Sequence, residues 1–235
     1  MQFDPPLVPA TLLRRYKRFL ADVILEDGRE VTVHCANPGK MLGVSTPGAR
    51  VWLQPATDPK RKLQWSWRLI ELEDGHLAGI DTGVPNRIVG EALSARAIPE
   101  LAPWQTIRPE VKYGENSRVD FHLSGGPGPD IWLEVKNVHL RREDTLAEFP
   151  DSVTTRGAKH LRELSARVAA GERAVMLYVI QRTDCDRIAM AADLDPAYAE
   201  AFERAADTGV EMICHGTRIS PDGVQLAGAL PVIRR

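Results

Sequence analysis

Two short runs of alternating apolar and polar residues, joined by a Gly/Pro-rich stretch, constrain this chain more than any other feature. The runs span residues 118–123 and 131–136, and residues 124–129 separate them. Period-2 alternation predicts strands, and the Gly/Pro cluster predicts the turn of a hairpin. Suppose that the two strands pair with Phe121 facing Leu133, so that the numbers of any two facing residues sum to 254. One face of the hairpin is then entirely apolar. That face consists of Val119, Phe121, Leu123, Ile131, Leu133 and Val135.

The opposite face of this predicted hairpin concentrates charge. Asp120 lies opposite Glu134, with Arg118 and Lys136 beside them. Two carboxylates whose Cβ atoms are about 5 Å apart repel each other, so a cation is needed to offset the repulsion. Mg²⁺, with Mn²⁺ as a substitute, takes oxygen ligands of this kind and commonly keeps water or substrate phosphate in its shell.

This charged face predicts hydrolysis of a phosphodiester. Asp120 and Glu134 would hold the metal with the Val135 carbonyl as a further ligand, and Lys136 would orient the attacking water or stabilise developing charge. The catalytic candidates are therefore Asp120, Glu134 and Lys136. The alternative is a solvated hairpin face with a Lys–carboxylate pair, because Asp followed at a distance by Glu-x-Lys often occurs by chance. The residues alone leave both interpretations open.

The composition is that of an ordinary globular chain, long enough for one large domain or two modest ones. Of its 235 residues, 43% are hydrophobic and 26% are charged. No apolar run approaches the roughly 18–20 residues needed to cross a membrane, and the N-terminus lacks the pattern of a secretory signal. Three scattered cysteines fit a reducing compartment. We therefore expect a cytoplasmic protein with no membrane partner.

Charge is distributed unevenly along the chain. Residues 1–68 carry eleven Lys and Arg against six Asp and Glu, whereas the remaining 167 residues carry nineteen against twenty-six. A basic first part joined to an acidic remainder indicates that the first part contacts a polyanion.

The first 80 or so residues are patterned mostly as short strands with turn residues between them. About five such strands predict a small barrel or sandwich. The clearest candidates are residues 18–25, 30–35, 49–54 and 65–72.

The pattern changes after residues 81–85, where helices begin to alternate with strands. Asn86 is a candidate N-cap for a helix to about residue 97. The predicted order is helix, three strands, helix, strand, helix, strand, which is a mixed α/β sheet with the charged hairpin in its middle. The later elements are strands at 106–112, 118–123 and 131–137, a helix from residue 154 or 155 to 171, a strand at 174–180, a helix from 195 to 209 and a strand at 210–214.

This order, with Asp and Glu-x-Lys on the second and third strands, resembles the restriction-endonuclease-like, PD-(D/E)xK, nuclease fold. The whole chain resembles the sugar fermentation stimulation protein A family. The motifs that carry the resemblance are residues 13–22, 34–41, 117–121, 134–137, 149–151 and 155–161. Two positions depart from the expected pattern: Val119 replaces the proline of the nuclease motif, and Pro38 stands where Thr or Ser is expected, which removes a hydroxyl contact.

The resemblance implies a two-domain α+β protein. Residues 1–83 would form an OB-like small β-barrel, and residues 84–235 a mixed α/β restriction-endonuclease-like domain. It further implies a DNA-binding protein linked genetically to sugar metabolism. Because that fold places the helix after Glu134 beside the active cleft, Arg156 and Lys159 become candidate phosphate contacts. His160 in the same helix is either part of this cleft or a half-buried histidine, and Glu91 is a weak candidate for an additional acidic residue.

The basic first part supplies the other nucleic-acid candidates. A tight cluster flanks Tyr16, and a basic loop precedes Trp65 and Trp67, which are either stacking platforms or core. The turn that contains Gly39 either approaches a nucleic-acid backbone closely or is simply tight. A solvated basic edge is the alternative for the first cluster. These candidates are Arg14, Arg15, Lys17, Arg18, Asn37, Lys40, Arg61 and Lys62.

Two functions from different classes fit these features. The first is a DNA-binding protein with a Mg²⁺-dependent nuclease site. The second is a non-catalytic DNA-binding or regulatory protein of sugar metabolism whose nuclease-like site is idle. RNA is an alternative ligand, because OB-folds accept either polymer, and a homodimer is left open. No helix-turn-helix pattern is evident, which argues against sequence-specific operator reading.

Overall fold

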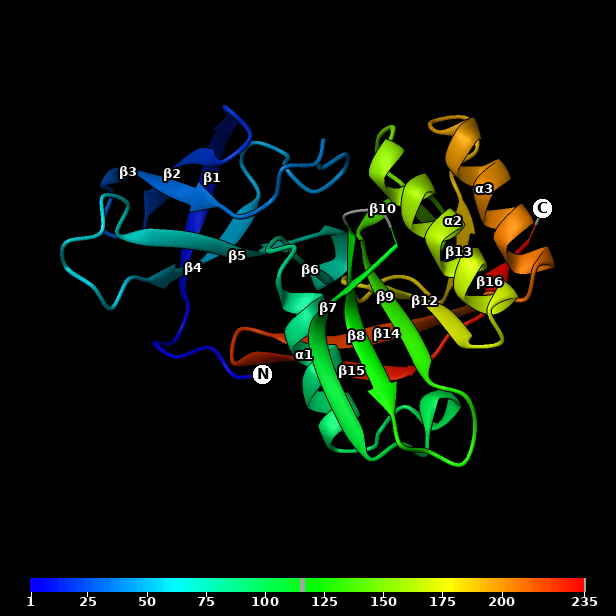
Figure 1. The fold of residues 1–235 in the computed structure, drawn as a ribbon. Helices are drawn as coiled ribbons and strands as arrows, with labels where there is room; N and C mark the ends of the chain where they lie inside the picture. The colour runs from blue at the N-terminus through cyan, green and yellow to red at the C-terminus, as the bar shows by residue number, and fades with distance from the viewer. Residues whose placement is uncertain (115–116, 235) are drawn as a thin grey trace.

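The first part of the chain forms a five-stranded closed barrel in this computed structural model, which describes residues 1–114 and 117–234 (Figure 1). Antiparallel pairing gives the strand order β3-β2-β1-β4-β5, and a parallel β3–β5 pair at Cys35 and Trp67 closes the barrel. Closure brings the first and last strands of this order together, and the inward-facing residues fill the interior. The strands are β1 (Val8–Tyr16), β2 (Leu20–Leu25), β3 (Glu30–Cys35), β4 (Arg50–Pro55) and β5 (Trp65–Glu71), and the short β6 (Leu77–Gly79) extends from β5.

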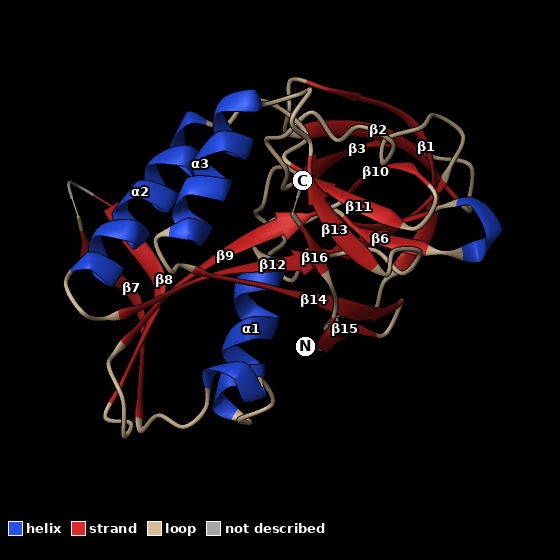
Figure 2. Ribbon diagram, turned by 90° about the vertical axis from the view of Figure 1, so that its right-hand side faces the viewer, coloured by secondary structure: helices blue, strands red, loops and turns tan. Residues whose placement is uncertain are grey.

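The second part is built on a six-stranded mixed sheet with helices on both faces. Its strand order is β15-β14-β12-β9-β8-β7, with β12 parallel to both β9 and β14. Helix α1 (Val84–Ser94) covers one face, and α2 (Thr155–Ala169) and α3 (Pro196–Asp207) cover the other (Figure 2). The strands are β7 (Thr106–Tyr113), β8 (Ser117–Ser124), β9 (Ile131–Val138), β12 (Arg173–Ile180), β14 (Glu211–Ser220) and β15 (Gly223–Ala229).

A small second sheet, which the sequence pattern did not predict, lies beside the carboxyl end of β9. Its order is β10-β11-β13-β16, and its strands have only two to four residues, too few to show a period. They are β10 (Leu140–Glu143), β11 (Leu146–Phe149), β13 (Arg187–Met190) and β16 (Val232–Ile233), and two 3₁₀ turns occupy Glu73–Gly75 and Pro99–Leu101.

The predicted register of the central hairpin is confirmed from Phe121 to Leu123, but the predicted pairing of Asp120 with Glu134 is not formed. Phe121 pairs with Leu133, and the neighbouring pairs of β8 and β9 also have residue numbers that sum to 254. The recorded pairing ends at Leu133. Val119 departs from the predicted apolar face, because it packs in the cluster beneath α2 whereas Phe121 and Val135 pack beneath α1.

Residues before the barrel belong to the core of the second part. Phe3 and Leu7 pack with α1, and the amide of Phe3 donates to the Asp222 carbonyl. The packing units are therefore not divided cleanly at residue 83, and the boundary between residues 83 and 84 stays a prediction. Among the described residues, no helix is long and apolar enough to cross a membrane.

Candidate active site and nucleic-acid surface

The two predicted metal-binding carboxylates lie where β8 and β9 stop pairing. Asp120 Oδ2 accepts a hydrogen bond from the Val135 amide at 2.7 Å, so the side chain takes a ladder position that a backbone carbonyl would otherwise fill. Asp120 Oδ1 accepts from Asn86 Nδ2, also at 2.7 Å. Both oxygens of Asp120 are thus oriented by neighbours from β9 and from α1.

Asn86 has a different role from the one predicted. Helix α1 begins at Val84 with Gly83 as its N-cap residue and Pro85 in its first turn, so Asn86 lies inside the helix and does not cap it. Its side chain instead reaches Asp120, 34 positions along the chain. An Asn near a helix start is a local capping signal, so the sequence offered no indication of this distant contact.

Glu134 is buried, with 3% of its surface exposed, and its two oxygens have unequal surroundings. Lys136 Nζ lies 2.5 Å from Oε1, and His160 Nδ1 hydrogen-bonds the same oxygen. Oε2 is buried without a hydrogen-bond partner among the described residues. Burial opposes ionisation of Glu134, but the hydrogen bond from His160 and the charge of Lys136 outweigh it and lower the pKa.

Asp120 is shifted in the opposite direction. Burial and then repulsion by Glu134 raise the pKa of Asp120 to about 6, although the Val135 amide, Lys136 and Asn86 partly offset this. Two neighbouring carboxyl groups whose pKa values are pushed apart are typical of a functional site. Additional positive charge at the pair would favour ionisation of both.

The donor set fits a hard divalent cation. Glu134 Oε2 is a buried oxygen that lacks a partner, and Asp120 places a second carboxylate nearby. Within residues 1–114 and 117–234, no group of three or more His, Cys, Asp or Glu side chains could hold a metal. One or two carboxylates completed by water and phosphate suit Mg²⁺ better than zinc, which prefers closed nitrogen and sulfur sets. The Val135 carbonyl as a further ligand stays a prediction.

The start of α2 lies beside this pair. Thr154 caps the helix by accepting from the Gly157 amide, and the buried His160 lies about one turn further on. Arg156 is exposed, and its Nε lies 3.3 Å from His160 Nε2. Lys159 forms an ion pair with Glu163 at 3.6 Å. Arg156 is thus linked to Glu134 by way of His160. The phosphate contacts predicted for Arg156 and Lys159 stay predictions.

Glu91, the weak additional acidic candidate, is occupied elsewhere. Its carboxylate pairs with the N-terminal ammonium of Met1 at 2.5 Å. This contact lies at the β15 side of α1, because the same ammonium donates to the Val224 carbonyl.

The basic cluster around Tyr16 divides into exposed and internal members. Arg14 is exposed, pairs with Asp22 and lies over the Tyr16 ring, and Lys17 and Arg18 form the exposed β1–β2 turn. Arg15 turns inward and donates to the carbonyls of Arg18, Asn37 and Gly39. The guanidinium of Arg15 thus supports two loops of the barrel, and its predicted contact with nucleic acid stays a prediction.

The loop that contains Asn37 and Lys40 also has an internal and an exposed member. Asn37 is 1% exposed, and its amide donates to the Ile80 carbonyl and accepts from Gly39. Both polar atoms of its side chain are therefore used inside the fold, and its predicted nucleic-acid contact stays a prediction. Lys40 is exposed. A Cβ on Gly39 would lie 2.9 Å from Asp151 Oδ2, so the glycine permits contact between the two domains.

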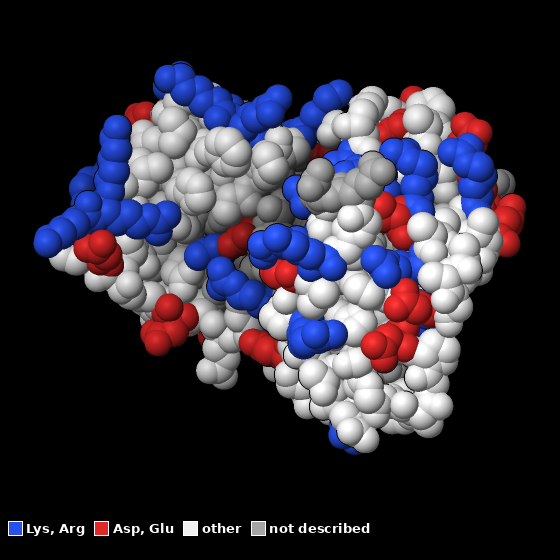
Figure 3. All heavy atoms as spheres, viewed as in Figure 1, with Lys and Arg blue, Asp and Glu red and all other residues white. Residues whose placement is uncertain are grey.

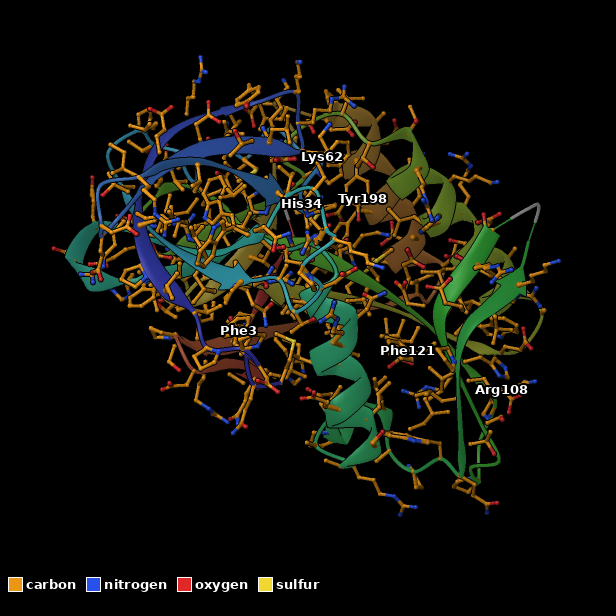
Figure 4. All side chains as sticks on the ribbon, turned by 90° about the vertical axis from the view of Figure 1, so that its left-hand side faces the viewer. Phe3, His34, Lys62, Arg108, Phe121 and Tyr198 are labelled. Atoms are coloured by element: carbon orange, nitrogen blue, oxygen red, sulfur yellow. The ribbon has the colours of Figure 1, made fainter. Side chains whose placement is uncertain are left out.

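Arg61 and Lys62 are exposed in the loop between β4 and β5. Figure 4 shows Lys62 and His34 on the barrel. Trp67 is fully buried, which confirms the core interpretation for it, and Trp65 is half-buried against the same barrel core. The sequence pattern missed Phe19, which is 47% exposed beside Arg18, because an aromatic residue next to an alternating run is typically core.

Positive charge continues from the barrel to α1. Burial lowers the pKa of Arg68 on β5, and Arg87 and Arg61 lower it further against the opposing effect of Asp81. Arg87 is exposed on α1 directly after Asn86. Figure 3 shows Lys and Arg side chains around the hollow between the two halves of the molecule. Arg87 thus places an exposed positive charge one residue from Asn86, whose side chain hydrogen-bonds Asp120.

A closed OB barrel followed by a restriction-endonuclease-like α/β domain defines a class of two-domain α+β proteins. The sequence matches two family models, one described as the SfsA N-terminal OB domain over residues 13–80 and one as the sugar fermentation stimulation protein RE domain over residues 83–223. The chain belongs to the sugar fermentation stimulation protein (SfsA) family. The resemblance and the fold class inferred from the sequence are both confirmed.

Relatives and one solved structure support this membership. A sugar fermentation stimulation protein homolog from Dinoroseobacter shibae is 65% identical and covers 99% of this chain and 96% of its own. One from Paramagnetospirillum magneticum is 56% identical, covering 98% and 97%. The structure of Pyrococcus furiosus SfsA in complex with Ca²⁺ is 27% identical, with a TM-score of 0.89 and coverage of 99% of this chain and 98% of that one.

Proposed function

We propose that this protein binds DNA and hydrolyses its phosphodiester bonds with a divalent cation, Mg²⁺ or Mn²⁺. The observation that carries the proposal is the buried Glu134 Oε2, which lacks a partner among the described residues although Asp120 lies beside it. A buried carboxylate oxygen left unpaired costs about 1–3 kcal/mol or more, and a cation would offset that cost. Asp120 and Glu134 would hold this cation, and the Val135 carbonyl could add a ligand.

The chain's own groups divide the chemistry among them. When bound, the cation would polarise the phosphate and acidify water. Asn86 and the Val135 amide orient Asp120 before any substrate arrives, so little reorganisation remains for the reaction. Lys136 Nζ is held at Glu134 by a 2.5 Å contact and can turn from there to orient the attacking water or to stabilise charge on the phosphate.

The binding surface would extend from the barrel to α1. The exposed basic residues of the barrel can neutralise phosphates. They are Lys17, Arg18, Lys40, Arg61 and Lys62. Arg87 continues this charge onto α1, one residue from the Asn86 that orients Asp120. This arrangement supports a path that leads a strand from the barrel to the carboxylates.

The archaeal relative adds independent support for a cation. That protein was solved in complex with Ca²⁺. Ca²⁺ takes the same oxygen ligands as Mg²⁺ with a longer and more flexible geometry. A family member that accepts Ca²⁺ is consistent with a divalent site in this chain.

The test is cleavage of labelled single-stranded, duplex and branched DNA, and of RNA, at low salt with Mg²⁺, Mn²⁺ or EDTA. We expect metal-dependent cutting by the wild type, loss of cutting in Asp120→Ala and Lys136→Ala, and DNA binding in EDTA that is largely retained by both variants. Retained cleavage by Asp120→Ala would refute the site assignment. Cleavage of RNA alone would show that the substrate is RNA and not the proposed DNA.

The second function, a DNA-binding module with an idle site, is an outcome of the same experiment. The observation that favours it is the contact between Lys136 and Glu134, which engages the lysine in the absence of substrate. Binding without cutting under every cation would establish this function and reject the nuclease.

A further inference from the structure

His160 distinguishes the two oxygens of Glu134. The histidine is 3% exposed on α2, and its neighbour Leu161 is fully buried in the core, so the imidazole has little freedom to move. Its Nδ1 hydrogen-bonds Glu134 Oε1, whereas Oε2 lacks a partner among the described residues. The two oxygens of a carboxylate are chemically equivalent, but here Oε1 is already engaged by the hydrogen bond with His160.

The network also assigns the tautomer of His160. Arg156 Nε lies 3.3 Å from His160 Nε2, and a guanidinium can only donate, so Nε2 must accept. Nδ1 then carries the hydrogen and donates to Glu134 Oε1. Lys136 Nζ lies 3.2 Å from Nδ1 because both are donors that converge on the same oxygen.

We propose that His160 is a positioning residue that holds Glu134 Oε1 through its Nδ1–H and thereby directs Oε2 to the divalent cation. This inference rests on the proposed cation site. With Oε1 held by His160, Lys136 can leave Glu134 for the reacting water without depriving that buried oxygen of its donor. Side chains that orient a ligand in this way commonly affect metal affinity about 10–100-fold.

A matched pair of variants at position 160 separates the effect of the N–H donor from the effect of side-chain shape. The Nδ2 of an asparagine lies as many bonds from Cβ as Nδ1 of histidine, whereas leucine has nearly the shape of asparagine and no donor. We expect His160→Leu to weaken Ca²⁺ binding, measured by calorimetry without DNA, by at least about tenfold. His160→Asn should bind within about threefold of the wild type. Equal weakening in both variants, or none in either, would overturn the positioning role.

The calorimetry also separates this inference from the proposed function. If the wild type bound no Ca²⁺, the cation site and the inference would both fall. If the wild type and both variants bound alike while Glu134→Gln did not, only the role of His160 would fall. Thermal denaturation without cation checks that each variant is folded.

A second measurement determines the tautomer of His160 in the wild-type protein. Nitrogen-15 spectra of labelled histidine at neutral pH should show His160 with a protonated Nδ1 and an unprotonated Nε2, with the signal identified by its absence in His160→Asn. An Nε2–H tautomer would contradict the donation to Glu134 and overturn the proposal.

Discussion

At the residue scale, the charged carboxylate of Asp120 suits a bound cation but lowers the folding stability of the cation-free protein. Its carboxyl titrates in the folded chain at about 6, above its unfolded value of about 4, because burial and Glu134 disfavour its charge. The native state therefore holds the proton more tightly than the unfolded state. This contribution is present in full below about pH 4 and is lost as the pH rises through about 6.

We therefore expect Asp120→Asn to stabilise the cation-free protein at neutral pH. The gain should be about 1–3 kcal/mol at pH 7.5 and close to zero at pH 4, since asparagine carries no charge to bury. Urea denaturation in EDTA at the two pH values measures it. A difference between variant and wild type that did not change with pH would contradict the raised pKa of Asp120.

Gly39 is a second residue whose role is set by one contact. Gly39→Ala would bring a Cβ within 2.9 Å of Asp151 Oδ2 and 3.1 Å of Asn37 Oδ1, so the loop or the aspartate must shift. We expect a loss of about 1–3 kcal/mol in unfolding free energy. Gly128→Ala is the control, because nothing lies within 4 Å of a Cβ there, and it should be neutral or slightly stabilising. Equal effects of the two substitutions would argue against the crowding.

At the scale of the element, one aspartate joins the starts of two helices. Asp195 Oδ1 accepts from the Tyr198 amide as the N-cap of α3, and its Oδ2 accepts from the amide of Thr154, the N-cap residue of α2. Asp195 is buried, with 2% exposed, so these bonds are shielded from water. The side chain therefore fixes the start of α2, the helix that carries His160.

Because Asp195 satisfies two amides, its loss should exceed the loss of a single cap. We expect Thr154→Ala to cost about 1 kcal/mol and Asp195→Ala at least about 2 kcal/mol in chemical denaturation. Asp195→Asn keeps one accepting oxygen and should fall between wild type and Asp195→Ala. A cost for Asp195→Ala no larger than for Thr154→Ala would show that the second bond contributes little.

At the scale of the whole molecule, hydrogen bonds lead from β9, which carries Glu134 and Lys136, to the contact between the second domain and the barrel. Asn137 follows Lys136 and hydrogen-bonds His139, which lies 3.2 Å from Asp151. Asp151 in turn accepts from the Met41 amide of the barrel. Burial opposes ionisation of Asp151, but His139 and Met41 lower its pKa to about 2, so the carboxylate is charged at neutral pH.

The proposed binding surface predicts a change in salt dependence. If Arg61 and Lys62 each neutralise a phosphate, replacing both with alanine should reduce the slope of log affinity against log salt by about 1.8 on duplex DNA. Arg204→Ala removes an exposed charge from α3, where Arg204 pairs with Glu200, and should leave the slope unchanged. Fluorescence anisotropy across a salt series measures both, and identical slopes for all the variants would place the DNA elsewhere.

The local pattern predicted most of the architecture of this chain. The pairing of Phe121 with Leu133 follows from the period of two and the intervening turn, because a shift by one residue would expose the apolar side chains. Helices α2 and α3 follow from their apolar spacing and from their caps Thr154 and Asp195, whereas the predicted cap of α1 was wrong. The short strands β10 and β13 were missed, because four residues show no period and β13 pairs with strands distant in sequence.

The sequence by itself therefore determined the three helices, most of the longer strands, the hairpin register from Phe121 to Leu123 and the identity of Asp120, Glu134 and Lys136 as candidates, since each depends on residues close along the chain. Only the tertiary structure decided which polar groups meet. Asn86 reaches Asp120 across 34 positions, His160 reaches Glu134 across 26, and Met41 reaches Asp151 across 110. No local period encodes such contacts, because the packing of α1 and α2 on opposite faces of the sheet and the docking of the barrel bring them together.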